Sequence, residues 1–392
     1  MRILVLSFYY EPDLCAGSFR NTTMVNALSG LLNNNDELEV ITTLPNRYHT
    51  FSAEAQFYEE IGNIKIRRTM LPVHKSGMID QSRAFISYAR SVWKHTRGKS
   101  YDLIYASSSR LMTAFLGALL AKKYKTFLYL DIRDIFTDSM EDLLSNNLLR
   151  FVVPVLKSIE KFTIHNANWI NLVSPGFEDH YLAIDTSNKY STYTNGIDDV
   201  FIDYDFSHDA NADGSTEILY AGNIGEGQGL HKIIPAAAEK LGSEWKIRII
   251  GDGGMKTELQ RKVDGLENVI LEAPVPRKML LERYKQADIL FLHLNNHPAF
   301  QKVLPSKVFE YGATGKPIVA GVAGVAADFL RNNVINSSIF PPCDANEFIE
   351  AIKKLDMRHI PRNDFINNYR RSNIVKKQVK DIMQFAKNNS LE

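Results

Sequence analysis

The sequence predicts an α/β protein built from two doubly wound, Rossmann-like domains. Short apolar runs alternate with helical patterns along most of the chain, which is typical of parallel sheets covered by helices on both faces. The alternation pauses once and then restarts, and 392 residues are too many for one ordinary core. We therefore expect a domain at 1–200, a second at 201–363, and a terminal segment at 364–392 that returns to the first domain.

Six short apolar or β-branched runs predict the strands of the first domain. They cover residues 2–10, 38–45, 64–70, 101–108, 126–134 and 169–175. Helical patterns at 21–32 and 110–123 separate several of them, as the crossover connections of a parallel sheet require.

The second domain begins after a linker at 194–216, which is rich in Asn, Asp, Gly and Ser. Its expected strands cover residues 217–224, 245–253, 268–274, 287–294 and 316–322. A charged, amphipathic pattern at 364–388 predicts one long final helix.

Composition narrows the class of protein. The chain has 46 basic and 45 acidic side chains, so no net field draws it to nucleic acid. Two distant cysteines provide neither a disulfide framework nor a thiolate metal site, which suits a reducing cytoplasm. The longest apolar run, 111–121, is about half of the ~20 residues that cross a bilayer. The first residues, followed by Glu11, Pro12 and Asp13, are interpreted as a strand and not as a signal peptide.

Ligands of open α/β sheets lie beyond the carboxyl ends of the strands, and the first candidate segment there is "EPDLCAGSFR". Gly17 and Ser18 precede a helix whose first turn carries Arg20 and no acid. A cation there opposes the helix dipole, unless the helix end faces an anion such as phosphate. The alternative is an ordinary loop with a solvent-facing arginine.

Two further segments follow strands of the second domain. "YAGNIGEGQGL" places Gly222 and Gly225 where a glycine-rich loop lets the backbone approach a diphosphate. In "LEAPVPRKML", two prolines flank Val275, whose backbone could meet a planar base, with Arg277 nearby. Plain turns before helices are the alternative for both segments.

The fourth segment is "LPSKVFEYGATGKPIV". Ser306 suits the cap of a helix, Lys307 in its first turn opposes the dipole, and Glu310 lies one turn further on. A cation beside free amides can hold a diphosphate, and the carboxylate can accept two ribose hydroxyls. The alternative is a capped surface helix with a Lys–Glu pair.

Together these segments resemble family 4 of the retaining glycosyltransferases, which have the two-Rossmann GT-B fold. The resemblance covers almost the whole chain through "FYYEPDLCAGSFR", "LPNRY", "DIRDIF", "SPGF", "TNGID", "LYAGNIGEGQGL", "IIGDGG", "VPRKML" and "LPSKVFEYGATGKPIV". It is strongest with the branch that builds O-antigen and capsular polysaccharide from nucleotide-activated N-acetylamino sugars, including the N-acetyl-L-fucosamine transferases.

The resemblance also implies roles for single residues. Glu310 matches the ribose-binding member of an E-x7-E pair, but Lys302 stands where the first Glu belongs. The phosphate-binding cations of the wider family fall at Asn223 and Gln228, which are uncharged here, so Lys307 is expected to carry that charge. Many members have His-Asp where this chain has Arg133-Asp134, which implies a catalytic role for Asp134.

The resemblance implies a UDP-sugar donor, a lipid-linked saccharide acceptor, retention of configuration and no metal or other cofactor. The stretch at 84–99 mixes apolar and basic side chains, which suits either contact with an anionic membrane at the inner face of the cell membrane or a core-facing helix with a solvated basic side. A UDP-sugar 2-epimerase and a two-lobed sugar-binding protein are the alternative functions.

Overall fold

A computed structural model describes residues 1–33, 35–46, 54–72, 78–108, 110–135, 137, 149–207 and 214–389, and all structural statements below concern these residues. The chain divides into two compact units. Residues 1–194 and 372–392 form the N-terminal unit, and residues 195–371 form the C-terminal unit. The chain therefore returns to the N-terminal unit at its end. Parts of the motifs "LPNRY" (44–48) and "DIRDIF" (131–136), of the linker at 194–216 and of the terminal segment at 364–392 lie outside the described residues.

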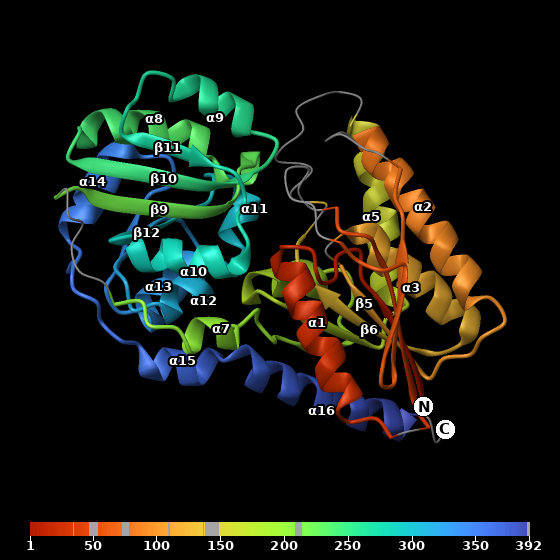
Figure 1. Ribbon diagram of the computed structural model, residues 1–392. Coiled ribbons are helices and arrows are strands. Elements are labelled where there is room, and N and C mark those ends of the chain that lie inside the picture. Colours follow the sequence, from red (N-terminus) through yellow and green to blue (C-terminus); the bar gives the residue numbers. More distant parts are fainter. Residues whose placement is uncertain are drawn as a thin grey trace. The chain divides into compact units, whose positions relative to one another are not determined.

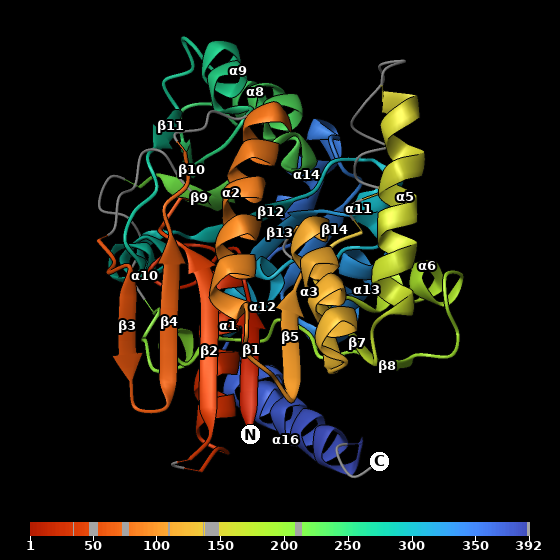
Figure 2. The same cartoon turned by 90° about the vertical axis from the view of Figure 1, so that its right-hand side faces the viewer.

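The described part of the N-terminal unit contains an eight-stranded sheet in the order β3-β4-β2-β1-β5-β6-β7-β8 (Figure 2). The strands are β1 (Arg2–Leu6), β2 (Glu37–Thr43), β3 (Tyr58–Ile61), β4 (Ile64–Thr69), β5 (Leu103–Ser107), β6 (Phe127–Ile132), β7 (Trp169–Leu172) and β8 (Lys189–Ser191). Only the edge pair β3–β4 is antiparallel. Strands β1 and β5 are almost wholly buried, as expected of central strands covered on both faces.

Helices cover both faces of this sheet (Figure 1). The helices are α1 (Ala16–Ser29), α2 (Met78–Thr96), α3 (Leu111–Tyr124), α5 (Leu149–His165), η1 (Pro175–Phe177), α6 (Glu178–Leu182) and α16 (Arg371–Asn389). Apolar side chains of α1 and α16, among them Met24, Val25 and Val379, share one core cluster with Ile3 and Val5 of β1. The terminal helix thus completes the core on that face.

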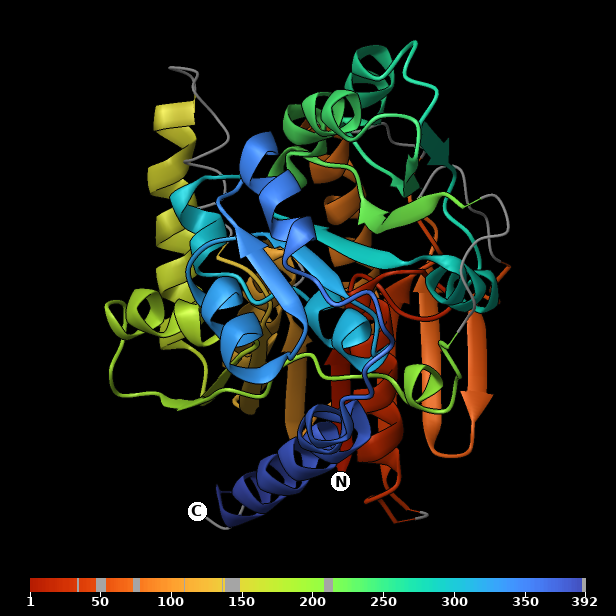
Figure 3. The same cartoon turned by 90° about the vertical axis from the view of Figure 1, so that its left-hand side faces the viewer.

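The C-terminal unit is a second parallel sheet in the order β11-β10-β9-β12-β13-β14 (Figure 3). Its strands are β9 (Thr216–Asn223), β10 (Trp245–Asp252), β11 (Val269–Glu272), β12 (Ile289–His293), β13 (Ile318–Gly321) and β14 (Ser337–Phe340). In chain order this is 3-2-1-4-5-6, the strand order of a Rossmann fold.

The helices of this unit pack in two layers. They are α7 (Asp199–Ile202), η2 (Glu226–Gln228), α8 (Leu230–Leu241), α9 (Lys256–Lys262), α10 (Arg277–Gln286), α11 (Pro298–Gln301), α12 (Lys307–Ala313), α13 (Val325–Asn333), α14 (Ala345–Lys353) and α15 (Asn363–Tyr369). One core cluster joins the sheet to α10, α12, α13 and α15, and a separate cluster joins it to α8, α9 and α14.

The α/β class, the parallel sheets and the predicted strands are confirmed. Sequence patterns missed β3, β8 and β14, three short strands with mixed or polar sequences. The single final helix was wrong: Arg370 adopts φ −59° and ψ 121°, which ends α15 before α16 begins. Among the described helices, none combines the length and the apolar character needed to cross a bilayer.

Candidate functional site

The candidate site of the C-terminal unit lies where the strand order reverses, at β9 and β12. From β9 the chain winds towards β10 and β11, and from β12 it winds towards β13 and β14. In open α/β sheets this reversal opens the crevice in which ligands bind, beyond the carboxyl ends of the strands. The residues that end β9 and follow it, 222–229, therefore have the expected position for donor contacts.

Backbone segments approach very closely at the end of β9. A Cβ on Gly251 would lie 1.8 Å from the carbonyl oxygen of Gly222, a distance that no side chain tolerates. Gly222 itself lies under the side chain of Lys307, because a Cβ there would be 2.5 Å from Lys307 Cε. Two of the predicted site residues, Gly222 and Lys307, are therefore in direct contact.

Lys307 is the first residue of α12, whose N-terminal end was predicted to bind an anion. The structure leaves fewer groups available at this end than the sequence suggested. Ser306 is the N-cap residue, but its backbone is already helical and its side chain makes no capping bond, so the predicted side-chain cap was wrong. Its carbonyl accepts the amides of Phe309 and Glu310 at 3.1 and 3.3 Å. Among the described residues, the backbone N–H groups of Ser306 and Lys307, at the start of α12, donate no hydrogen bond.

Lys307 and Glu310 form an ion pair on α12. The ammonium Nζ lies 3.6 Å from Glu310 Oε2, with side-chain exposures of 19% and 9%. The same ammonium lies 5.6 Å from the centre of the Tyr311 ring. The hydroxyl of the buried Tyr284 donates to Glu310 Oε2 at 3.3 Å. The structure thus gathers a reachable cation and a largely buried carboxylate beside the end of β9.

The far end of α12 is anchored by Arg362, which sequence reasoning missed. Its buried guanidinium donates to the carbonyls of Gly312, Lys316 and Ile335 at 3.2, 2.8 and 2.8 Å. Burial lowers the pKa of Arg362 to about 10. A cation at a helix C-terminus stabilises the helix dipole, so Arg362 fixes the helix that carries Lys307.

Asn223 and Gln228 bind each other after β9. The Asn223 side-chain amide donates to Gln228 Oε1 at 2.7 Å, and the amide of Gly225 donates to the same oxygen at 3.2 Å. Asn223 therefore shapes the glycine-rich loop through its side chain. No cation of this loop replaces the phosphate-binding charges that the wider family is expected to have, which leaves Lys307 as the charge beside Gly222.

His293, the last residue of β12, ties this loop to the sheet. Its Nδ1 lies 2.6 Å from the carbonyl oxygen of Gln228, and its Nε2 accepts the amide of Cys343 at 2.9 Å. These partners require a neutral ring that carries its proton on Nδ1. Burial lowers the pKa of His293 to about 4. The sequence analysis assigned His293 no role. The feature that could have indicated one is its position as a polar residue at the end of an otherwise apolar strand.

Val275 and Arg277 lie beyond β11 at the start of α10. Val275 is partly buried against the core, and Pro276 is the N-cap residue. The Arg277 guanidinium forms an ion pair with Asp198 and lies 5.2 Å from the centre of the Phe201 ring. Arg277 is thus engaged within its own unit, and its predicted phosphate contact would have to compete with Asp198.

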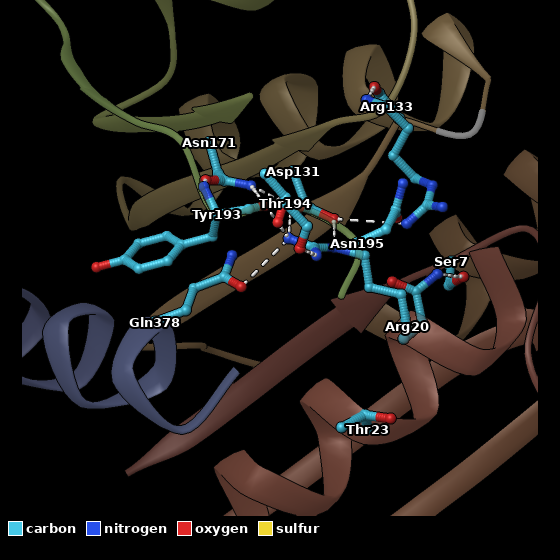
Figure 4. A network of polar contacts seen from close by, with 12 residues as sticks. Ser7, Arg20, Thr23, Asp131, Arg133, Asn171, Tyr193, Thr194, Asn195 and Gln378 are labelled. Atoms are coloured by element: carbon cyan, nitrogen blue, oxygen red, sulfur yellow. Dashed lines mark hydrogen bonds and ion pairs between the residues drawn. The ribbon is translucent and has the colours of Figure 1, made fainter. Parts of the chain in front are cut away.

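In the N-terminal unit, the predicted phosphate role of Arg20 was wrong (Figure 4). Arg20 is 0% exposed, and Nε and Nη2 donate to the two carboxylate oxygens of Asp131 at 2.8 and 2.9 Å. It also donates to the carbonyls of Tyr193 and Thr194 at 3.0 and 2.6 Å. A cation in the first turn of a helix is unfavourable, and here the buried carboxylate of Asp131 offsets that cost. The Arg20 guanidinium is thus occupied by partners within its own unit.

The two neighbours of Arg20 in the prediction are also internal. Gly17 and Ser18 lie inside the first turn of α1, not in the loop before it, and both are buried. The Ser18 side chain is 0% exposed, so its hydroxyl does not reach a ligand. The donor contacts predicted for Gly17 and Ser18 depend on backbone amides at this helix end, and they stay predictions.

Asp131 is the centre of this buried network. Asn171 donates to Asp131 Oδ1 at 2.8 Å, and Gln378 of α16 accepts from Arg20 at 3.2 Å. Burial raises the pKa of Asp131, but the Arg20 guanidinium outweighs burial and the net pKa is lowered. Burial likewise lowers the pKa of Arg20, and the Asp131 charge more than offsets it. The network stabilises the fold and joins α1, β6, β7 and α16.

Arg133 and Asp134 lie at the end of β6 and point to different environments. The Arg133 guanidinium is 9% exposed and lies 4.0 Å from Asp131 Oδ2, at the margin of the Arg20 network. Asp134 is exposed, and its carbonyl accepts the Tyr181 hydroxyl at 3.3 Å. Among the predicted site residues of this unit, Gly17, Ser18 and Arg20 are buried, and Asp134 is exposed just beyond the carboxyl end of β6.

No cluster of three or more His, Cys, Asp or Glu side chains suited to a metal ion occurs among the described residues. The catalytic roles predicted for Lys307, Glu310 and Asp134 remain predictions.

One family of known proteins matches most of the C-terminal unit. Residues 203–372 match the family described as Glycosyl transferases group 1, and they include Gly222, Lys307 and Glu310. The sequence matches no curated protein.

Solved structures of the same fold cover almost the whole chain. The lipopolysaccharide outer core galactosyltransferase WaaB in its apo form shares 13% identity over 99% of this chain and 100% of its own, with a TM-score of 0.61. HepE of Anabaena in complex with UDP-glucose shares 15% identity over 98% and 99%, with a TM-score of 0.64. MnaA of S. aureus with UDP shares 13% over 99% and 97%, with a TM-score of 0.58. The predicted GT-B fold of two Rossmann-like domains is confirmed by these structures.

Proposed function

We propose that the chain is a retaining glycosyltransferase that moves an N-acetylamino sugar from a UDP-sugar to a hydroxyl of a lipid-linked saccharide, in the synthesis of a surface polysaccharide. The observation that carries the proposal is the contact of Lys307 with Gly222 at the end of β9, with the carboxylate of Glu310 3.6 Å from the ammonium. The match of residues 203–372 to glycosyl transferases group 1 supports the reaction class. The UDP and UDP-glucose bound by MnaA and HepE support a uridine nucleotide as the donor.

The chemistry follows from the charges at this site. When the bond between the anomeric carbon and the β-phosphate oxygen breaks, its electron pair stays on the leaving diphosphate. The Lys307 ammonium and the amides of Ser306 and Lys307 would stabilise that developing negative charge. The acceptor oxygen forms the new bond on the same face of the sugar, and its proton passes to the departing phosphate. Glu310 would accept hydrogen bonds from the ribose, and no step requires a metal.

The N-terminal unit is proposed to bind the acceptor. Asp134 is the candidate contact, because it is an exposed residue just beyond the carboxyl end of β6, where ligands of such sheets bind. Carboxylates accept hydrogen bonds from sugar hydroxyls, which suits a saccharide acceptor.

A thermal-shift panel of nucleotide sugars tests the donor. A ligand at 100 times its dissociation constant stabilises the native state by about 2.7 kcal/mol, so the cognate UDP-sugar should raise Tm visibly. Lys307→Ala should lose most of that shift. If no uridine nucleotide stabilises the protein, the proposal is wrong. Incubation with the donor alone excludes the alternative of a 2-epimerase if the sugar is unchanged or only hydrolysed.

Helix α2 is the proposed membrane contact of a cytoplasmic protein at the inner face of the cell membrane. Its apolar residues fall into a buried and an exposed group. Phe85, Tyr88 and Val92 pack in the core, whereas Ile86 and Trp93 are 48% and 43% exposed. Arg90, Lys94 and Arg97 share the helix or follow it, and Lys123 lies 3.8 Å from the centre of the Trp93 ring. Exposed apolar and basic side chains together favour an anionic lipid surface. Failure to sediment with anionic liposomes would refute this contact.

A further inference from the structure

We propose that Tyr284 is a positioning residue that fixes the Glu310 carboxylate, and that it thereby determines how strongly the protein prefers a ribonucleotide donor. This inference rests on the proposed function, in which Glu310 binds the ribose. Tyr284 lies on α10, is 0% exposed, and its hydroxyl donates to Glu310 Oε2 at 3.3 Å.

The contacts of Glu310 are all on one carboxylate oxygen. Lys307 Nζ and the Tyr284 hydroxyl both approach Oε2, at 3.6 and 3.3 Å. Within the described residues, no side chain or amide donates to Oε1 of Glu310. A carboxylate held by two donors on one oxygen has its other oxygen oriented and available. That oxygen can accept hydrogen bonds from a pair of neighbouring hydroxyls, as a ribose provides.

Packing holds Tyr284 in a single orientation. Its ring stacks on Phe201 with centroids 5.9 Å apart and planes 20° apart, and it meets the Tyr311 ring edge-to-face at 5.4 Å and 82°. The Tyr311 hydroxyl in turn accepts the amide of Ala221, the residue before Gly222, at 3.2 Å. Burial raises the pKa of Tyr284 well above its ordinary value, so the phenol remains a neutral donor. The two packed tyrosine rings thus connect β9, through Ala221, to the carboxylate of Glu310.

Removal of the Tyr284 hydroxyl should therefore act on ribose recognition alone. Tyr284→Phe keeps the ring and its packing but leaves Lys307 as the one described side chain that holds the Glu310 carboxylate. A hydrogen bond to a charged group contributes more than a neutral one, so we expect UDP to bind about tenfold more weakly. The affinity for 2′,3′-dideoxy-UDP, which has no hydroxyls for Glu310, should change by less than about twofold. A merely structural role would weaken both nucleotides equally.

Calorimetric titration of the full-length chain with both nucleotides tests the inference. Tyr369→Phe is the matched control, because its hydroxyl also makes one side-chain bond in this unit, to Asn333 at 3.0 Å, and it should leave both affinities unchanged. In a Glu310→Gln background, Tyr284→Phe should cause little further loss, because the two substitutions remove one shared interaction.

The outcomes separate the inference from its premise. Equal weakening of both nucleotides by Tyr284→Phe, or no weakening while the unmodified protein still prefers UDP, would overturn the inference and leave the proposed function standing. If the unmodified protein binds UDP and dideoxy-UDP equally, the ribose role of Glu310 is wrong and the inference fails with it. Absence of UDP binding would refute the proposed function itself.

Discussion

A single methyl group at Gly222 should displace the cation on which the proposed donor site depends. The Cβ of Gly222→Ala would lie 2.5 Å from Lys307 Cε, 3.2 Å from the hydroxyl oxygen of Tyr220 and 3.4 Å from Lys307 Nζ. The nearest atom belongs to the flexible end of a side chain, so the backbone need not move. Ordinary contact begins at 3.4 Å, so the Cε atom must retreat by about 0.9 Å, and the ammonium must move with it.

The expected loss follows from what the ammonium contributes. A charge-assisted hydrogen bond to phosphate is worth about 1.5–3 kcal/mol, which corresponds to about 10–100-fold in affinity. The lysine can recover part of the contact by changing rotamer, so we expect UDP to bind about tenfold more weakly. The fold should be unaffected, because alanine suits a strand better than glycine and the Lys307–Glu310 pair is worth only about 0.2–0.5 kcal/mol.

Calorimetric titration with UDP measures the loss, and a thermal melt of each variant checks the fold. Gly254→Ala is the matched control, because a Cβ at Gly254 meets no atom within 4 Å and its affinity should be unchanged. In a Lys307→Ala background, Gly222→Ala should have no further effect, since the displaced group is already absent. A Gly222→Ala protein that binds UDP as tightly as the unmodified chain, or that loses further affinity without Lys307, would refute the reasoning.

Three more substitutions test the other parts of the site. Lys307→Ala should lower the turnover of the cognate sugar donor about 10²–10³-fold with an unchanged melting profile, because this is the usual cost of removing one hydrogen-bonding group from a developing anion. A folded variant that is fully active would contradict the assignment. Arg20→Met should destabilise the N-terminal unit by about 3–5 kcal/mol in urea unfolding, because Asp131 is left buried without its charge partner, and an unchanged midpoint would show that the pair is dispensable. His293 has a pKa of about 4 in the folded chain, below its unfolded value of about 6.5, so stability should be full above pH 6.5 and fall by about 2 kcal/mol at pH 5. His293→Gln should flatten that part of the pH dependence and the exposed His165→Gln should not; parallel curves for all three proteins would exclude His293 as the cause.

The sequence predicted the fold well because each central strand is a continuous apolar run. Strands β1, β5 and β12 are almost entirely buried, and apolar residues occupy most of their length without alternation. The missed strands β3 and β8 lie at the edges of their sheet, where one side meets solvent and the apolar pattern weakens. Edge strands of three or four residues carry too few apolar positions for a pattern to appear.

The candidate site was predicted unevenly for a related reason. Gly222, Lys307 and Glu310 could be found because strand ends and charge placement along α12 are visible in the sequence. The role of Arg20 could not, because its partner Asp131 is 111 residues away and only the folded sheet brings the two together. Tyr284 likewise contacts Glu310 from another helix, 26 residues away in the sequence, and a local sequence pattern does not predict such a contact.

The anchoring of α12 by Arg362 has a consequence for how such a protein can vary. Every acceptor of this guanidinium is a main-chain oxygen, at Gly312, Lys316, Ile335 and, at 3.4 Å, Asn336. Main-chain oxygens are supplied by any residue, so Lys316 and Ile335 can exchange side chains and still accept from Arg362. Gly312 is restricted by its contact with Phe365, and Asn336 is restricted by its φ of 55° and by its side-chain bonds to the Asp356 backbone. The position of Lys307 on α12 is thereby protected against substitutions at the residues that accept these hydrogen bonds.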